Sequence, residues 1–517
     1  MTPPFDNNEP HLIVRKTRVR DIDGFCGTVE YLGPVASAKN ENEIYAGIGW
    51  DDPSRGKHDG SVICRKTKQL VRHFSSKGGS FLRLSKVDTG IPLDLPVIQS
   101  KYVEPDAPLV APNNILPHSA RTSSGREKPI EFHGEIKLRD RQQVELLSRI
   151  ALRNMGISSV APNMCGLELV VDLDLGGNLL CDWSIMSSLQ AFPNLASLSL
   201  ASNRLGDLEE TPRFKNSRLS LLNVHSCGIK SFMTIQRLDE AFPGIEQLCV
   251  AGNDLSDLTA VEAVCGFQAL TRLDMSSCKL ATWGDHVRKL SALPSLETLL
   301  INFNEVDSIP AKIENGSFQH LQNLYLTGVL VSDWVDVQGL SSLPSFRSLA
   351  LRNTPLTASM GTAEARFVII SRFPNLEIVN SSPISAKERS EAEKRYVTHV
   401  SQELLLADKS EINKEDFLAT NHPQFTRLAE KFHQEMKRQG QVVTGQTVSS
   451  YAVNVTITSL ASDSCTMEPI HKRLPSSLTV GRLKALCVRA FGLDFDLQVL
   501  HCRAEVRENT LLSNLSR

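Results

Sequence analysis

The chain has 517 residues, of which 41% are hydrophobic and 22% charged, and its net charge is 56 − 58 = −2. This length predicts several domains, and a charge so near zero excludes bulk attraction to nucleic acid or to an anionic membrane. The eleven cysteines include no Cys-x-x-Cys pair and no His/Cys cluster at zinc spacing. We therefore expect reduced thiols, no metal site and a cytoplasmic protein. The N-terminus shows no signal-peptide pattern, and no apolar run approaches the ~20 residues of a membrane span.

Residues 11–88 are predicted to form a small all-β domain. Short alternating runs bounded by Gly, such as "GTVEYLG", "EIYAGIGW" and "GGSFLRL", are typical of strands. Between the last two of these runs lies "WDDPSRGKHDGS", from Trp50 to Ser61. Its Asp-Pro and Asp-Gly dipeptides suit a surface turn, and its Gly residues permit unusual backbone angles. Taken alone, the stretch is either a hairpin loop or a binding site.

Residues 89–130 change in character. Prolines recur from Pro92 to Pro117, and a stretch rich in Ser, Gly and charge follows. Proline at this density breaks helices and central strands, so the segment is predicted to be a Pro/Ser-rich linker.

Residues 131–397 carry an internal repeat that matches the template L-x-x-L-x-L-x-x-N-x-L. Nine copies start at positions 147, 170, 195, 219, 245, 270, 296, 321 and 346. This regularity predicts an α/β leucine-rich-repeat solenoid with a C-terminal cap. The ninth position is Asn in the strong copies and Cys at Cys227 and Cys278. We expect these side chains to bond loop backbone groups that would otherwise be buried and unpaired.

The third and fifth positions of each repeat should point out onto the concave face, because side chains alternate along a strand. Concave solenoid surfaces bind proteins. The protein-binding candidates on this face are Asp172, Asp174, Leu221, Leu300 and Tyr325. For the last two, packing against a neighbouring domain is an equally good interpretation. A further apolar position, which holds Trp183, Trp283 and Trp334, is predicted to be convex-side core.

The C-terminal part divides in two. Residues 398–450 are predicted to be a charged helical segment followed by a linker. Residues 451–517 show the order β-β-α-β, with strands expected at Tyr451–Thr458 and Asp496–Arg503, and are predicted to be a β-grasp, ubiquitin-like domain.

The motif "GKHDG", with its flanks "GTVEYLG", "GIGWDDPSR" and "GGSF", resembles the CAP-Gly domain. The resemblance implies a groove for C-terminal peptides that end in Glu-Glu-Tyr or Glu-Glu-Phe, with a Lys that meets carboxylates. A terminal carboxylate suits uncovered backbone N–H groups and a cation. The peptide-binding residues are then Tyr45, Trp50, Gly56, Lys57, His58, Asp59, Gly60 and Phe81. The family's Tyr-Phe pair before "GGSF" is matched to Leu70-Val71.

The order of modules resembles the tubulin-specific chaperones. This resemblance implies a non-enzymatic, cytoskeleton-associated protein that binds α-tubulin and works with tubulin-folding cofactors D and C and the small GTPase Arl2. No catalytic motif is present, and we expect no cofactor. One alternative is a microtubule-associated CAP-Gly scaffold or adaptor. A second alternative is a proteasome-shuttle role for the ubiquitin-like segment.

Overall fold

The structure is a computed structural model. It describes residues 13–40, 42–102, 119–121, 127–129, 144–161, 164–314, 316–407, 414–438, 452–460, 467–475, 480–492 and 498–500. The chain divides into two units, Met1–Leu428 and Ala429–Arg517, which are described separately below. Within the described ranges, no helix is long and apolar enough to cross a membrane.

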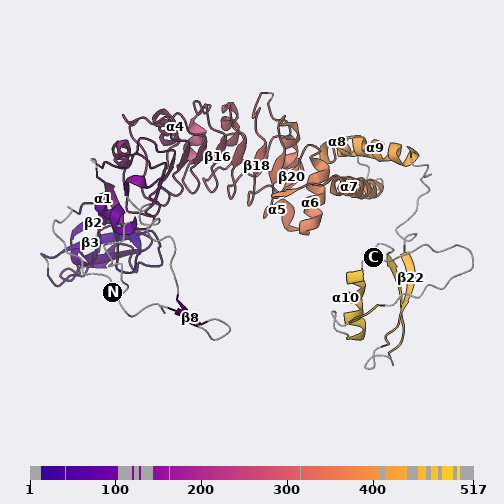
Figure 1. The fold of residues 1–517 in the computed structure, drawn as a ribbon, viewed down its shortest axis with the longest axis horizontal. Coiled ribbons are helices and arrows are strands. Elements are labelled where there is room, and N and C mark those ends of the chain that lie inside the picture. Colours follow the sequence, from indigo (N-terminus) through magenta and orange to yellow (C-terminus); the bar gives the residue numbers. More distant parts are fainter. Residues whose placement is uncertain are drawn as a thin grey trace, which may run out of the picture. The chain divides into compact units, whose positions relative to one another are not determined.

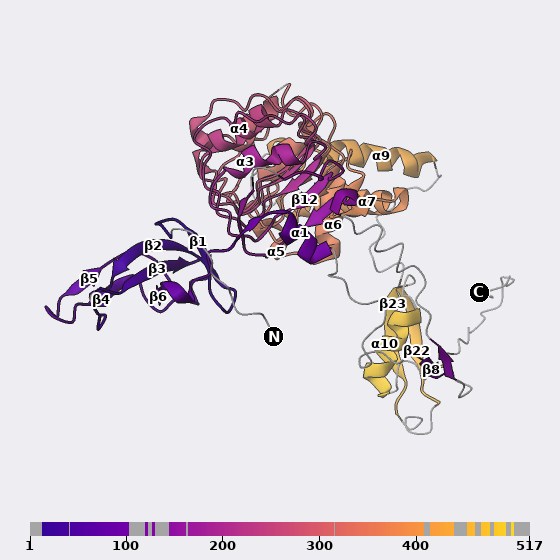
Figure 2. The ribbon, with the colours of Figure 1, turned by 60° about the vertical axis from the view of Figure 1, so that its left-hand side comes forward.

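An antiparallel sheet with strand order β1-β2-β3-β6 forms the N-terminal β domain, and β4 and β5 make a separate hairpin at its end (Figure 2). The strands are β1 (Arg18–Arg20), β2 (Cys26–Pro34), β3 (Ile44–Trp50), β4 (Ser61–Ile63), β5 (Leu70–Arg72) and β6 (Gly79–Arg83). One face of β3 is buried through Ala46, Ile48 and Trp50, which pack with Val19 and Val29. The opposite face of β3 is therefore the one that can serve a ligand.

The start of the expected linker is instead part of the solenoid. Strand β7 (Ile91–Leu93) pairs in parallel with β11 (Ile157–Val160), and helix α1 (Leu95–Tyr102) follows it. Leu93 and Ile98 are completely buried in the solenoid core. Pro92 is tolerated because it lies in a short strand at the edge of a two-stranded sheet, where a missing N–H costs little. Of the rest of 89–130, the structure describes only a small hairpin, β8 (Ser119–Arg121) with β9 (Glu127–Pro129).

The repeats build one parallel sheet whose strands occupy the third to fifth positions of all nine predicted copies (Figure 1). These strands are β10 (Arg149–Ala151), β12 (Asp172–Asp174), β13 (Ser197–Ser199), β14 (Leu221–Asn223), β15 (Gln247–Cys249), β16 (Arg272–Asp274), β17 (Thr298–Leu300), β18 (Asn323–Tyr325) and β19 (Ser348–Ala350). In β12, β13, β14, β17 and β18 the middle residue is buried and its two neighbours are half-buried. The alternation expected from the sequence is therefore confirmed in these strands.

The eighth position of every repeat has a left-handed backbone. It is filled by Asn154, Gly177, Ser202, Ser226, Gly252, Ser277, Phe303, Gly328 and Asn353, whose φ angles lie between 53° and 72°. Gly, Asn and small polar residues tolerate this conformation, whereas a large side chain does so at a cost. The turn directs the ninth residue into the solenoid, where it can bond the loop backbone.

Asn203 shows what the ninth position does. Its Nδ2 donates to the carbonyls of Leu175 and Leu200 at 3.0 and 2.8 Å, and its Oδ1 accepts from the amide of Leu180 at 3.2 Å. Cys227 uses its thiol in the same way, donating to the Leu200 carbonyl at 3.2 Å. Burial raises the pKa of the Cys227 thiol to about 12, so it stays protonated and remains a donor. The expectation for the ninth position is confirmed.

We expect Asn203→Ala to lower the free energy of unfolding by about 1–3 kcal/mol, because it leaves buried backbone groups without partners. Asp174→Ala, at a half-buried outward position, should change it by no more than about 0.5 kcal/mol. Chemical denaturation of both variants measures the difference. A larger loss for Asp174→Ala would contradict the assigned register.

Short helices and 3₁₀ turns form the side of the solenoid opposite the strands. They are α3 (Ile185–Ser188), α4 (Phe232–Ala241) and the 3₁₀ segments Leu189–Ala191, Ser256–Ala260, Val287–Ala292 and Val335–Ser342. Trp183 and Trp283 are buried there as predicted, but Trp334 is only half-buried. This exception is the first sign of a cavity near the end of the solenoid.

The solenoid ends in helices, which continue into the segment after residue 398 that was predicted to be helical. Strands β20 (Ile378–Val379) and β21 (Ser382–Pro383) close the sheet. The helices of this region are α5 (Pro355–Ala358), α6 (Thr362–Arg372), α7 (Ala386–Ala407) and α8 (Lys414–Asn421), and α9 (Phe425–Arg438) runs from the first unit into the second. Helix α7 crosses the predicted boundary between 397 and 398 without a break, so the cap extends at least through α8.

In the second unit, β22 (Ala452–Ile457) pairs antiparallel with β23 (Ile470–Pro475), and α10 (Val480–Phe491) follows. Cys487 and Phe491 lie on its buried side. This β-β-α order agrees with the prediction. Of the strand expected at Asp496–Arg503, only residues 498–500 are described, and they form no strand.

Candidate peptide-binding groove and concave surface

The Gly-rich loop of the β domain is held against the start of β6 by its own backbone. The amides of Lys57 and His58 both donate to the Gly79 carbonyl at 3.0 Å, and the Gly79 amide donates to the His58 carbonyl at 2.7 Å. A Cβ atom on Gly56 would lie 2.2 Å from the Gly78 carbonyl carbon. A Cβ atom on Gly60, whose φ is +90°, would lie 2.1 Å from the Phe74 carbonyl oxygen. Both positions therefore require Gly, and the loop is closely packed rather than free.

Phe81 stands at the centre of an aromatic cluster on the ligand-facing side of the sheet. Its ring centroid lies 5.2 Å from Phe74, 5.6 Å from His73, 6.2 Å from His58 and 6.4 Å from Tyr31. Of these five residues, the sequence analysis named only Phe81 and His58. The aromatic pair that the sequence analysis matched to Leu70-Val71 corresponds instead to His73-Phe74, which directly precedes "SSKGGSF". Leu70 is 71% exposed on the β4–β5 hairpin.

Trp50 is not a groove residue. It is 6% exposed, packs in the domain core, and donates from Nε1 to Ser80 Oγ at 3.0 Å. The guanidinium of Arg55 covers its ring at 5.3 Å. Tyr45 lies on the face of β3 opposite to that of Trp50, which is the face of Gly47 and Phe81. Its hydroxyl donates to Glu43 at 2.8 Å. Of the two predicted residues, only Tyr45 therefore lies on the face that carries Phe81.

The segment that contains the loop is basic. Residues 55–77 hold seven Lys or Arg and one acidic residue, a local charge of 7 − 1 = +6 in a chain of net charge −2. Lys57 is exposed and forms no ion pair with any acidic residue that the structure describes. Asp59, the one acid, bonds the Ser61 amide at 2.9 Å and contacts Arg72 at 3.2 Å. The Ser61 hydrogen bonds, aided by Arg72, lower the pKa of Asp59. Asp59 thus holds the turn, and Lys57 is left for an acidic ligand.

On the strand face of the solenoid, Leu300 and Tyr325 are direct neighbours in register, and both are half-buried. Asp172 and Asp174 lie together on β12, five strands away, and Leu221 lies on β14 between them and the apolar pair. The predicted face therefore has an acidic end and an apolar end, and its candidates do not form one cluster.

Phe303 was missed by the sequence analysis. It is 61% exposed at a left-handed position with φ +54°, three residues after Leu300. The signal was present in the sequence, because all eight of the other residues at that position are Gly, Ser or Asn with short side chains and none is aromatic. An exposed aromatic held in an unfavourable backbone conformation is a candidate contact residue.

Comparisons with family models and with known proteins agree with these observations. The CAP-Gly domain model matches residues 15–87, and a leucine-rich-repeat model matches residues 282–407. Tubulin-folding cofactor E of Arabidopsis thaliana is 28% identical over 94% of this chain and 91% of its own length. The tubulin-specific chaperones E of Danio rerio and Homo sapiens are 29% and 26% identical, each over 91% of this chain and over 89% and 88% of their own lengths. The chain is thus similar to tubulin-specific chaperone E along nearly its whole length, and it contains a CAP-Gly domain and leucine-rich repeats.

Proposed function

We propose that this protein is a tubulin-specific chaperone that binds the C-terminal tail of α-tubulin in the Gly56–Gly60 groove and the folded body of α-tubulin on the concave face. The observation that carries the proposal is the Gly-rich loop packed beside an aromatic cluster, in a segment whose local charge is +6. An acidic peptide with a terminal aromatic residue complements this surface in charge and in shape.

Two modules on one chain suit this task. A short tail fills only the groove, whereas a folded protein needs the larger surface that solenoid strands provide. Once one contact forms, the second is effectively intramolecular, so overall affinity can exceed either contact by about 10²–10⁴. The resemblance further supports a non-enzymatic role in the cytoplasm beside cofactors D and C and the small GTPase Arl2, with 451–517 as a ubiquitin-like module.

The test is to incubate the full-length protein with αβ-tubulin, with and without cofactor D, and to follow free subunits by native gel electrophoresis. We expect the protein to change the amount of free α- and β-tubulin. If heterodimers are unaffected in both mixtures, the chaperone role is wrong.

The alternative, a microtubule-associated scaffold, is favoured by the same groove, because polymerised tubulin also exposes acidic tails. Co-pelleting separates the two roles. A chaperone should stay with soluble tubulin in the supernatant, whereas a scaffold should pellet with microtubules.

The groove itself is tested by Lys57→Ala. We expect this variant to bind a Glu-Glu-Tyr peptide about 1–3 kcal/mol more weakly than the unchanged protein, since one charge-assisted hydrogen bond is lost. The affinity of the unchanged protein should also fall as salt rises. Fluorescence anisotropy at low salt is the measurement, and equal affinities there would remove Lys57 from the site.

A further inference from the structure

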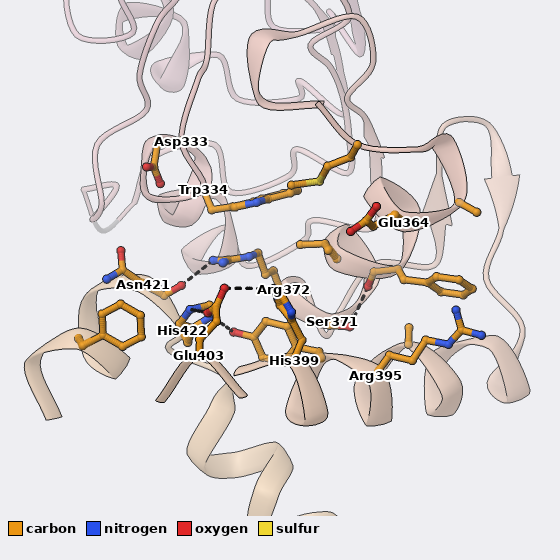
Figure 3. A pocket seen from close by; sticks show the side chains of 17 residues that line it. Asp333, Trp334, Glu364, Ser371, Arg372, Arg395, His399, Glu403, Asn421 and His422 are labelled. Atoms are coloured by element: carbon orange, nitrogen blue, oxygen red, sulfur yellow. Dashed lines mark hydrogen bonds and ion pairs between the residues drawn. The ribbon is translucent and has the colours of Figure 1, made fainter. Parts of the chain in front are cut away.

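A pocket with a cavity volume of about 930 Å³ lies at the C-terminal end of the solenoid, where α6, α7 and α8 meet the loop that carries Trp334 (Figure 3). The apolar part of its lining comes from Trp334, Phe367 and Phe417, together with Met360 and Val368. The volume lies in the upper part of the range of ligand sites. It belongs neither to the groove of the β domain nor to the strand face of the solenoid.

Arg372 points into this pocket from the end of α6 (Figure 3). The residue is 8% exposed, and its guanidinium lies 4.9 Å from the ring of Trp334 and 5.9 Å from that of Tyr396. Its Nη1 donates to the Asn421 carbonyl at 2.8 Å, but its buried Nε has no hydrogen-bond partner. Among the residues that the structure describes, no acidic side chain forms an ion pair with it. Burial without such a partner lowers the pKa of Arg372.

The facing wall presents an acceptor. Glu403, on α7, contacts Nε2 of His399 at 3.1 Å and Nε2 of His422 at 2.9 Å. The second contact sets Oε2 of Glu403 against the imidazole of His422 and buries that oxygen. Nδ1 of His422 is already engaged with the Tyr396 hydroxyl at 3.2 Å. Glu403 is thus already in contact with two imidazoles, whereas Arg372 keeps a donor without a partner.

A purely structural role explains only part of this arrangement. The bond from Arg372 to the Asn421 carbonyl ties the C-terminal end of α8 to the solenoid, where a cation is favourable. This bond uses one donor of a guanidinium that has five. A buried cation that lacks a carboxylate and leaves a donor unpaired is costly unless something else compensates it.

We propose that this pocket binds a peptide segment of a partner protein in which an acidic side chain lies beside large apolar ones. The incoming carboxylate pairs with Arg372, and the apolar side chains fill the space between Trp334, Phe367 and Phe417. Arg395, exposed on α7 at the rim with its guanidinium 4.5 Å from Phe367, adds a second positive charge for an acidic segment.

The probe is N-acetyl-Phe-Glu-Phe-amide, with N-acetyl-Phe-Gln-Phe-amide as its uncharged counterpart. Isothermal titration is carried out on the full-length chain that bears Lys57→Ala, and the amide cap removes the terminal carboxylate that the β-domain groove would recognise. We expect the Glu peptide to bind and the Gln peptide to bind at least about tenfold more weakly, because a charge-assisted bond is lost.

Two matched variants locate the binding. Ala363 is exposed and lines the pocket, so Ala363→Trp should fill the space while it leaves Arg372 in place. Ala358 is exposed on α5 and outside the lining, so Ala358→Trp makes the same change elsewhere. We expect Ala363→Trp to lose at least about tenfold in affinity and Ala358→Trp to match the parent chain.

The proposal is overturned if neither peptide binds, if the Glu and Gln peptides bind equally, or if Ala363→Trp binds as well as Ala358→Trp. Each of these outcomes is independent of tubulin. The chaperone role can therefore fail while this site stands, and the converse also holds.

Discussion

Gly60→Ala should destabilise the β domain by about 2–5 kcal/mol and abolish measurable binding of a Glu-Glu-Tyr peptide. A non-Gly residue at a left-handed φ of +90° costs about 1–2 kcal/mol. The new methyl group would also lie 2.1 Å from the Phe74 carbonyl oxygen, which cannot move without displacing the Phe74 ring from Gly47 and Gly79. Overpacking of this kind costs a further 1–3 kcal/mol or so.

Gly24→Ala is the matched control. Gly24 has nearly the same φ, +87°, but a Cβ atom there would meet no atom within 4 Å. Gly24→Ala should therefore cost only the backbone term of about 1–2 kcal/mol and leave peptide binding intact. Amide hydrogen exchange across β3 and β6 in the full-length chain measures both variants. Equal losses would mean that the loop does not press against Phe74.

The repeat was predictable because it is periodic. Each strand needs a buried Leu at the fourth position and a turn that brings the ninth residue inward, and both demands appear directly in the sequence. The exposed Phe303 and the half-buried Trp334 interrupt that pattern, and both lie where the surface could contact another molecule. Breaks in a regular pattern thus carried more functional information than the pattern itself.

The groove was predictable in its loop but not in its aromatic residues. Gly56 and Gly60 follow from a local motif, whereas Tyr31 on β2 and His73 and Phe74 after β5 meet Phe81 only through the tertiary fold. The basic insertion before "LVRHF" shifted the expected aromatic pair to Leu70-Val71. The alternation of side chains along β3 could have shown that Trp50 lies on the buried face, because Ala46, Ile48 and Trp50 alternate with Tyr45, Gly47 and Gly49.

The pocket around Arg372 could not be predicted from the sequence. Its walls come from three helices and a loop distant in sequence, and a lone Arg at a helix end gives no sequence pattern that predicts a pocket.

The segment of β7 and α1 was wrongly predicted for a different reason. Its prolines indicated a linker, but Leu93 and Ile98 bury their side chains against the first repeat, and tertiary packing outweighed the local preference.

Leu300→Glu combined with Tyr325→Glu should leave binding of a Glu-Glu-Tyr peptide unchanged but reduce affinity for αβ-tubulin at least about 30-fold, the effect of losing one interface hot spot. The two side chains are neighbours across β17 and β18 and form the apolar end of the face. The core beneath them is carried by Leu299 and Leu324, which are fully buried. The fold should therefore survive, with two like charges in register costing about 1 kcal/mol or less.

Thr298→Glu combined with Asn323→Glu is the matched control, because it adds the same charge to the same two strands at the other outward pair in register. If added charge alone repels tubulin, both double variants will lose affinity equally. If the apolar contact is what matters, only the Leu300/Tyr325 variant will lose chaperone activity, while circular dichroism shows both to be folded. Full activity of both double variants would mean that tubulin contacts another part of the face. The acidic end at Asp172 and Asp174 would then be the next site to test, because it holds the other contact candidates of the same strand surface and lies five strands away.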